Sequence, residues 1–198
     1  ASIITCGVDV QDNRVAVGLY AWGEGEESWL LNHFEIFGDP AGKKLWDQVD
    51  DVIFRPYKKE DGTELKVSAT GVDSGGHFTS EVYAYCRERA KRGVFALKGQ
   101  SQRNKPPIGK PSKVDINYKG QVLKNSAQVF PAGVDTIKST LFARLKLNEE
   151  GPGYIHFHAA ASPEYFKQLT SERQVVRYVK GFAIREWKKK PGDRNEAL

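Results

Sequence analysis

Alternating apolar and polar positions dominate the first forty residues of the chain. Residues 3–11 form a short apolar run, residues 13–22 alternate regularly, and residues 28–37 alternate again after a turn rich in glycine and glutamate. A period of two is typical of β-strands, and short polar or glycine turns between such runs are typical of antiparallel neighbours. The pattern therefore predicts a three-stranded antiparallel meander at the start of the chain.

Segments with helical spacing then alternate with β-type runs. In order, they are a helix from Asp39-Pro40 to Ile53, a strand ending at Asp73, a helix over 79–92 that stops at Gly93, and a short strand over 94–97. This order predicts an α/β fold with a mixed sheet flanked by helices, in which the strand ending at Asp73 lies parallel to the first strand.

The pattern in the second half of the chain predicts six further elements. They are a hairpin within 114–124, a helix over 133–147, a strand over 154–158, a helix opened by Ser162-Pro163, a hairpin that turns at Lys180-Gly181, and a helix capped by Asn195. His156 and His158 would share one face of their strand, but no further zinc ligand lies near them in the sequence. We therefore interpret them as surface histidines.

Length and composition bound the class of protein. A chain of 198 residues with 39% hydrophobic and 28% charged residues suits one globular domain over 1–198, and no apolar run approaches the roughly 20 residues that cross a bilayer. Two cysteines without a spaced motif predict neither a disulfide framework nor a zinc cluster, which fits a reducing, cytosolic setting. The absence of methionine suggests a domain cut from a larger chain.

The candidate chemistry begins with Asp9, a carboxylate within the apolar run Ile3 to Gln11. A buried aspartate needs protein donors or a cation to offset its lost hydration. A second run also ends in Gly-Val-Asp, at Asp73, and two such strands side by side would let both carboxylates share a divalent ion. The alternative is that Asp9 ends its strand and caps the turn over residues 12–14.

Three further residues are candidates for the same site. Either Asp193 or Glu196 would approach the sheet from the predicted late helix as a third carboxylate, and His77, four residues after Asp73, is a secondary candidate. Hard oxygen ligands without a cysteine or imidazole cluster favour Mg²⁺ or Mn²⁺ over Zn²⁺. Two such ions about 4 Å apart would serve phosphodiester hydrolysis.

A cationic segment follows the fifth predicted strand, which covers residues 94–97. Residues 98–113 carry no acid, three prolines and five cations, namely Lys98, Arg103, Lys105, Lys110 and Lys113. The net charge of the whole chain is +5, which suits a polyanionic partner. We predict an exposed basic loop that holds DNA phosphates, the alternative being a solvated, mobile loop.

Several short motifs, in this order and spacing, resemble the nuclease domain of the lambda-type (GpA family) large terminase subunits of tailed bacteriophages. They are Gly7-Val8-Asp9-Val10-Gln11, Gly25-Glu26-Glu27-Ser28-Trp29, Asp73-Ser74-Gly75-Gly76, Leu97-Lys98-Gly99, Gln168-Leu169-Thr170 and Arg194-Asn195-Glu196-Ala197-Leu198. The resemblance implies a ribonuclease-H-like fold and a two-metal endonuclease that cuts concatemeric viral double-stranded DNA during packaging in the host cell cytoplasm.

The same resemblance implies partners and ligands. The partners would be DNA, an ATPase domain in the same longer chain, the terminase small subunit and the portal protein, with no membrane. Asp9 and Asp73 would be metal ligands, and Glu196 would belong to an Asn-Glu-Ala-Leu motif that an aspartate normally follows, whereas this sequence ends at Leu198. Two alternatives stay open: another ribonuclease-H-like nuclease such as a junction resolvase, and a non-catalytic DNA-clamping or assembly module.

Overall fold

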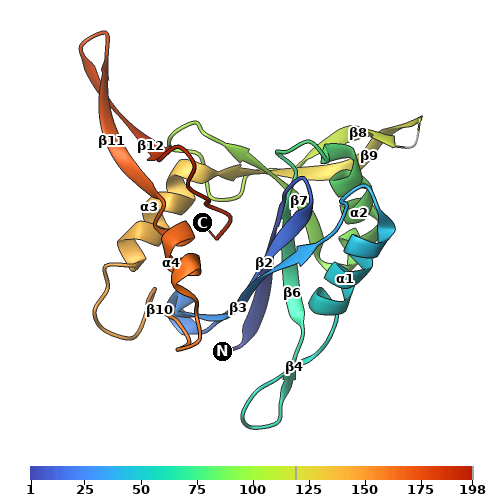
Figure 1. Ribbon diagram of the computed structural model, residues 1–198, viewed down its shortest axis with the longest axis horizontal. Coiled ribbons are helices and arrows are strands. Elements are labelled where there is room, and N and C mark those ends of the chain that lie inside the picture. Colours follow the sequence, from blue (N-terminus) through green and yellow to red (C-terminus); the bar gives the residue numbers. More distant parts are fainter. Residues whose placement is uncertain (119, 198) are drawn as a thin grey trace.

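An eight-stranded mixed sheet forms the centre of the computed structural model, which describes residues 1–118 and 120–197 (Figure 1). The last residue of the Asn-Glu-Ala-Leu motif, Leu198, lies outside the described residues. The predicted meander is confirmed: β1 (Ile3–Val10), β2 (Arg14–Trp22) and β3 (Ser28–Phe37) pair antiparallel in sequence order. The short 3₁₀ turn Glu24–Glu26 joins the last two.

Parallel strands extend the sheet from β1. β6 (Val67–Asp73) pairs parallel with β1, as predicted, and β7 (Val94–Gln100) pairs parallel with β6. The remaining strands lie towards the two edges: β9 (Gln121–Gly133) and β8 (Ser112–Tyr118) on one side, and β10 (Ile155–His156) beside β3 on the other. A small separate hairpin joins β4 (Tyr57–Lys58) to β5 (Glu64–Leu65). This mixed α/β architecture is consistent with a ribonuclease-H-like nuclease fold.

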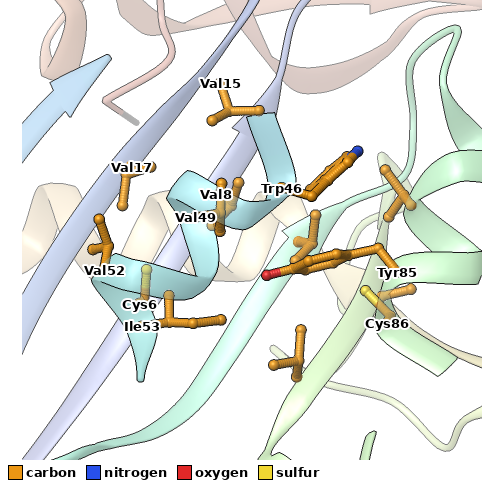
Figure 2. Close-up of a cluster of buried hydrophobic side chains, with 14 of the residues drawn as sticks. Cys6, Val8, Val15, Val17, Trp46, Val49, Val52, Ile53, Tyr85 and Cys86 are labelled. Carbon is orange, nitrogen blue, oxygen red and sulfur yellow. The ribbon is translucent and has the colours of Figure 1, made fainter. Parts of the chain in front are cut away.

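Two helices and the sheet enclose the main core. α1 (Lys43–Ile53) and α2 (Thr79–Arg89) pack their apolar side chains against residues of β1 and β2 (Figure 2). The aromatic rings of Trp46 and Tyr85 meet at 4.3 Å between centroids. The thiols of Cys6 and Cys86 are free and buried in this core.

The first helix begins later than predicted. Asp39 to Gly42 form a turn, in which the Gly42 N–H donates to the Asp39 carbonyl and the Ala41 N–H donates to Asp39 Oδ1, at 2.9 Å each. Asp39 therefore stabilises a turn before α1, and Lys43 is the first helical residue.

The opposite face of the sheet is covered by α3 (Val134–Arg144) and α4 (Pro163–Leu169). The Ser162 hydroxyl accepts a hydrogen bond from the Tyr165 N–H, which confirms the predicted cap of α4. A second, smaller cluster lies here around Leu30, Tyr165 and Leu169. No helix among residues 1–118 and 120–197 is long and apolar enough to span a bilayer.

Other predicted boundaries shift in the second half. The strand predicted over 94–97 runs to Gln100, the hairpin predicted within 114–124 is longer and formed by β8 and β9, and α3 ends at Arg144. The predicted C-terminal helix is wrong, because residues 191–197 form turns and irregular backbone. The last hairpin is confirmed, with β11 (Glu172–Val179) and β12 (Phe182–Lys189) joined at Lys180-Gly181, both with positive φ.

An ion pair joins α1 to α2 behind the core. Arg89 donates from Nε and Nη2 to the two carboxylate oxygens of Asp50 at 2.7 Å each, and the Tyr85 hydroxyl donates to the same carboxylate at 2.8 Å. We expect Asp50→Ala to lower the free energy of unfolding by about 2–4 kcal/mol, because it leaves a largely buried guanidinium and a hydroxyl without their acceptor.

Urea denaturation followed by tryptophan fluorescence measures this loss. The matched control is Asp47→Ala, which removes an exposed pair with Lys43 on the same helix and should cost less than about 1 kcal/mol. Equal losses in the two variants would contradict the assignment of the Asp50 pair as a structural link.

Candidate metal centre

The pairing of β1 with β6 places Asp9 and Asp73 next to each other. Gly7 pairs with Gly71 and Val8 with Val72, so the next positions along the two parallel strands are the two aspartates. Val8 and Val72 point into the core under α1 and α2. Because side chains alternate along a strand, both aspartates point to the opposite face, at the carboxyl ends of adjacent parallel strands.

A cavity of about 630 Å³ lies over this face of the sheet, and both aspartates line it. Its floor includes Gly7 and Gly18, its far wall includes Ile137 and Leu141 of α3, and Glu196 also lines it. A Cβ added at Gly7 would meet no atom within 4 Å, so glycine there leaves the floor open. The carboxylates thus lie at the end of a hollow between the sheet and α3.

Backbone and side-chain donors fix the two carboxylates. Gln11 Nε2 donates to Asp9 Oδ2 at 2.7 Å, and the Gly75 N–H donates to Asp73 Oδ1 at 3.1 Å. The loop after Asp73 is itself held, because the buried Ser74 hydroxyl donates to the Leu97 carbonyl of β7 at 2.7 Å. Each carboxylate therefore uses one oxygen within the protein and has a second oxygen for another ligand.

The local field favours a cation. The pKa of Asp9 is raised to about 6, mainly by burial, with smaller upward contributions from the negative charges of Asp73 and Glu196. The Gln11 hydrogen bond and the Arg14 charge act in the opposite direction. A divalent ion would relieve this repulsion between carboxylates. Hard oxygen donors on a rigid sheet fit Mg²⁺ or Mn²⁺.

Glu196 reaches the cavity but is held by arginines. Arg14 Nη2 donates to Glu196 Oε1 at 2.9 Å, and Arg194 donates to both Glu196 oxygens. Glu35 of β3 completes the group by accepting hydrogen bonds from both arginines. Burial alone would raise the pKa of Glu196, but the hydrogen bonds and charges of Arg194 and Arg14 outweigh it and lower that pKa.

The other predicted acid and the histidine do not line this cavity. Asp193 does not line the cavity with Asp9 and Asp73. His77 is exposed, and its Nδ1 lies 3.1 Å from Asp12 Oδ1 in a second hollow of about 450 Å³, which Asp9 and Asp73 also line. Within residues 1–118 and 120–197, no three His, Cys, Asp or Glu side chains are gathered closely enough to hold a metal ion.

The predicted basic loop is more ordered than a mobile loop. Lys98 lies in β7 and Lys113 in β8, so the loop proper is 101–111. Its middle is fixed to the start of α3, since the Lys105 carbonyl accepts from Thr136 Oγ1 at 2.6 Å. Side chains of four of the five cations are exposed, and Lys105 is half-buried.

His156 packs as a structural residue. Its Nε2 lies 2.7 Å from Glu27 Oε1, and its ring stacks on Trp29 at 4.9 Å. It is half-buried rather than exposed on the surface, and β10 ends at His156, so His158 is not part of the strand.

Comparison with known proteins decides the family. The family described as the endonuclease domain of the terminase large subunit gpA matches residues 1–198, the whole chain. This chain belongs to that family. It is 32% identical over 98% of its length to the terminase large subunit of Escherichia phage lambda, and 33% identical over 98% of its length to that of Enterobacteria phage P21. It spans 30% of the length of each of these relatives, and no solved structure matches it.

The family assignment confirms the resemblance stated from the motifs. The family is described as an endonuclease domain, and both of these relatives are terminase large subunits. The sequence predicted that Asp9, Asp73 and Glu196 lie near one another, and all three line the cavity, but it did not predict Gln11, Arg14 and Arg194 as their hydrogen-bond partners. Gln11 follows the Gly-Val-Asp motif closely enough to have been suspected, whereas nothing in the sequence links Arg14 to Glu196.

Asp9→Asn should stabilise the metal-free protein. Because the folded-state pKa of Asp9 lies above its unfolded value, ionisation of Asp9 costs stability above about pH 6, and this cost fades as the pH falls towards 4. We expect a gain of about 1–3 kcal/mol at pH 7.5 in EDTA, and a smaller gain at pH 4.5, by thermal unfolding.

The control for this measurement is Asp12→Asn, which removes an exposed carboxylate near the same strand end and should change stability by less than about 0.5 kcal/mol. A loss of stability in Asp9→Asn at pH 7.5, or a gain that does not depend on pH, would show that Asp9 is not under electrostatic strain.

Proposed function

We propose that this domain is a divalent-metal-dependent endodeoxyribonuclease that cuts concatemeric viral double-stranded DNA during genome packaging. The observation that carries the proposal is the adjacent placement of Asp9 and Asp73 on one face of the sheet, in a chain of a terminase endonuclease family. The proposed partners are double-stranded DNA, an ATPase domain in the same longer chain, the terminase small subunit and the portal protein, in the host cell cytoplasm.

Asp9 and Asp73 are the residues proposed to hold two Mg²⁺ or Mn²⁺ ions. When bound, such ions would activate the attacking water and stabilise the leaving oxygen of the phosphodiester. Gln11 and the Gly75 N–H each donate to one oxygen of a carboxylate, which leaves the second oxygen of each available to an ion. The charge of Asp9 is costly on its own, which supports a cation as its ligand.

Glu196 is proposed as the third acid of the site, ahead of Asp193. It lines the same cavity as Asp9 and raises its pKa, whereas Asp193 does neither. To ligate an ion, Glu196 would give up a hydrogen bond to Arg14 or Arg194. We therefore expect Arg14 and Arg194 to limit how readily the third acid joins the site.

One observation favours a second function. Among the described residues, Asp9, Asp73 and Glu196 are not close enough together to hold one metal ion, and Glu196 is paired with Arg14 and Arg194. Acids with such a structural role would be expected in a non-catalytic DNA-clamping module. The two functions differ in their response to substitution of Asp9 and Asp73, which a clamp would tolerate.

Asp9→Asn and Asp73→Asn, made separately, should each lower the rate of plasmid nicking in Mn²⁺ by more than about 100-fold, because each removes a charged metal ligand. Supercoiled plasmid resolved on agarose measures the rate, and DNA binding in EDTA should not weaken. The control is Asp51→Asn, an exposed acid of α1. If either variant nicks as fast as the parent protein, the clamping function is supported instead.

The basic loop is proposed to hold phosphates near the cut. Arg103→Glu with Lys110→Glu should weaken binding to a short duplex and reduce the slope of log affinity against log salt by about 2, roughly 0.9 for each phosphate that the protein no longer neutralises. Fluorescence anisotropy measures this slope when the salt concentration is varied from about 50 to about 200 mM. An unchanged slope would assign these cations to a solvated loop.

A further inference from the structure

The β11–β12 hairpin stands apart from the rest of the fold. In the part of the chain that the structure describes, its strands pair only with each other, and they project from the body beyond α3 (Figure 1). Its base is anchored to α3: Trp187 packs on Phe142 at 4.9 Å and donates to Asp135 Oδ1 at 3.2 Å. Such an isolated two-stranded hairpin adds little stability of its own, so its length beyond the base needs another explanation.

The outer part of the hairpin exposes large side chains. Near the Lys180-Gly181 turn, Tyr178 is 74% exposed and Phe182 is 76% exposed, and Val176 is 55% exposed further back. Neither strand contributes an apolar face to the main core. The ribbon is therefore built to contact something outside the domain.

The charge of the hairpin identifies the kind of partner. Residues 172–190 contain seven lysines and arginines but only two glutamates, whereas cations and acids are equal in number in the rest of the chain. The net charge of +5 of the whole domain is thus equal to the net charge of residues 172–190 alone. One of the two acids, Glu186, is paired with Arg177 and Lys188, and the other, Glu172, is buried at the base.

The cations lie on both faces of the ribbon. In the register of the hairpin, Arg173 pairs with Lys188 and Arg177 with Ile184, which places the cations of these pairs on one face. Val176 pairs with Arg185, one position along, so Arg185 points to the other face. A protein-binding hairpin would concentrate its apolar side chains on one face, but here exposed apolar and cationic side chains alternate on both.

A two-stranded ribbon with cations on both faces suits the major groove of duplex DNA. The groove is wide enough to admit such a ribbon, and phosphates border it on both sides. We propose that the β11–β12 hairpin is a second DNA-binding element of this domain, which lies in a groove of the duplex. The inference rests on the proposed function for DNA as the substrate, but it concerns a surface separate from the basic loop and from the carboxylates.

The base of the hairpin connects this surface to the candidate metal centre. Asn195 Nδ2 donates to Glu172 Oε1 at 2.7 Å, and Lys189 Nζ donates to Asn195 Oδ1 at 3.4 Å. Glu172 is also paired with Lys138 of α3 at 2.6 Å. The next residue after Asn195 is Glu196, so DNA held by the ribbon would be held beside the segment that carries the third acid.

The test compares DNA binding by the whole domain with and without the outer cations, in EDTA so that no cutting occurs. The variant is Arg177→Gln, Lys180→Gln and Arg185→Gln together, all exposed, with the anchored base intact. The matched control is Lys44→Gln, Arg87→Gln and Lys91→Gln, three exposed cations on or just after α1 and α2. Unchanged thermal unfolding of each variant verifies folding.

The hairpin variant should bind a short duplex at least about 10-fold more weakly at 100 mM salt and lose roughly 2.7 from the salt slope, while the control keeps parental affinity. A shortened ribbon, with residues 176–185 replaced by Asn-Gly, should lose affinity for duplex more than for single-stranded DNA, since only the duplex has a major groove.

Two results would overturn the proposal. If both hairpin variants bind duplex DNA as tightly as the parent protein, the ribbon would be assigned to a protein partner. If they lose affinity equally for duplex and single-stranded DNA, a groove contact would be excluded. Neither depends on plasmid nicking. Failure of the nuclease assignment would appear instead as unchanged cutting by Asp73→Asn, so the two failures are distinguishable.

Discussion

The parallel pairing of β1 with β6 is the constraint on which the candidate site depends. Its register sets Gly7 beside Gly71 and Val8 beside Val72, and it therefore sets Asp9 beside Asp73 on the face away from the main core. A shift of one residue would turn one aspartate into that core, where a charged carboxylate is very costly. The valines that fill the core and the aspartates that face the cavity are thus fixed by the same alternation.

Electrostatic repulsion is the cost of this arrangement. Asp9 is half-buried near two other acids, and desolvation together with their negative charges raises its pKa, so its charged form is disfavoured. Arg14 and Arg194 relieve part of this repulsion by pairing with Glu196 and Glu35, which joins the end of the chain to the first meander. Functional sites commonly lower the stability of the ligand-free protein, and ligand binding offsets this cost.

The sequence was sufficient to predict the meander strands and the adjacent positions of the two strand-end aspartates. Period-two alternation located β1, β2 and β3, and the repeated Gly-Val-Asp pattern identified Asp9 and Asp73 as a pair. The sequence did not predict features that depend on contacts between residues far apart in the chain. Arg14 and Glu196 are 182 positions apart, and Asn195 bonds to Glu172 at the base of the hairpin instead of capping a helix. The late start of α1 reflects a turn held by Asp39, which local propensity does not distinguish from a helical first turn.

The central claim is that Asp9 and Asp73 together bind a divalent ion. Anomalous diffraction from a crystal of the domain soaked in Mn²⁺ tests it most directly, because the signal locates the metal independently of activity. We expect a Mn²⁺ peak coordinated by carboxylate oxygens of both Asp9 and Asp73. A fully soaked crystal with no peak between these side chains, or with metal bound only elsewhere on the domain, would contradict it.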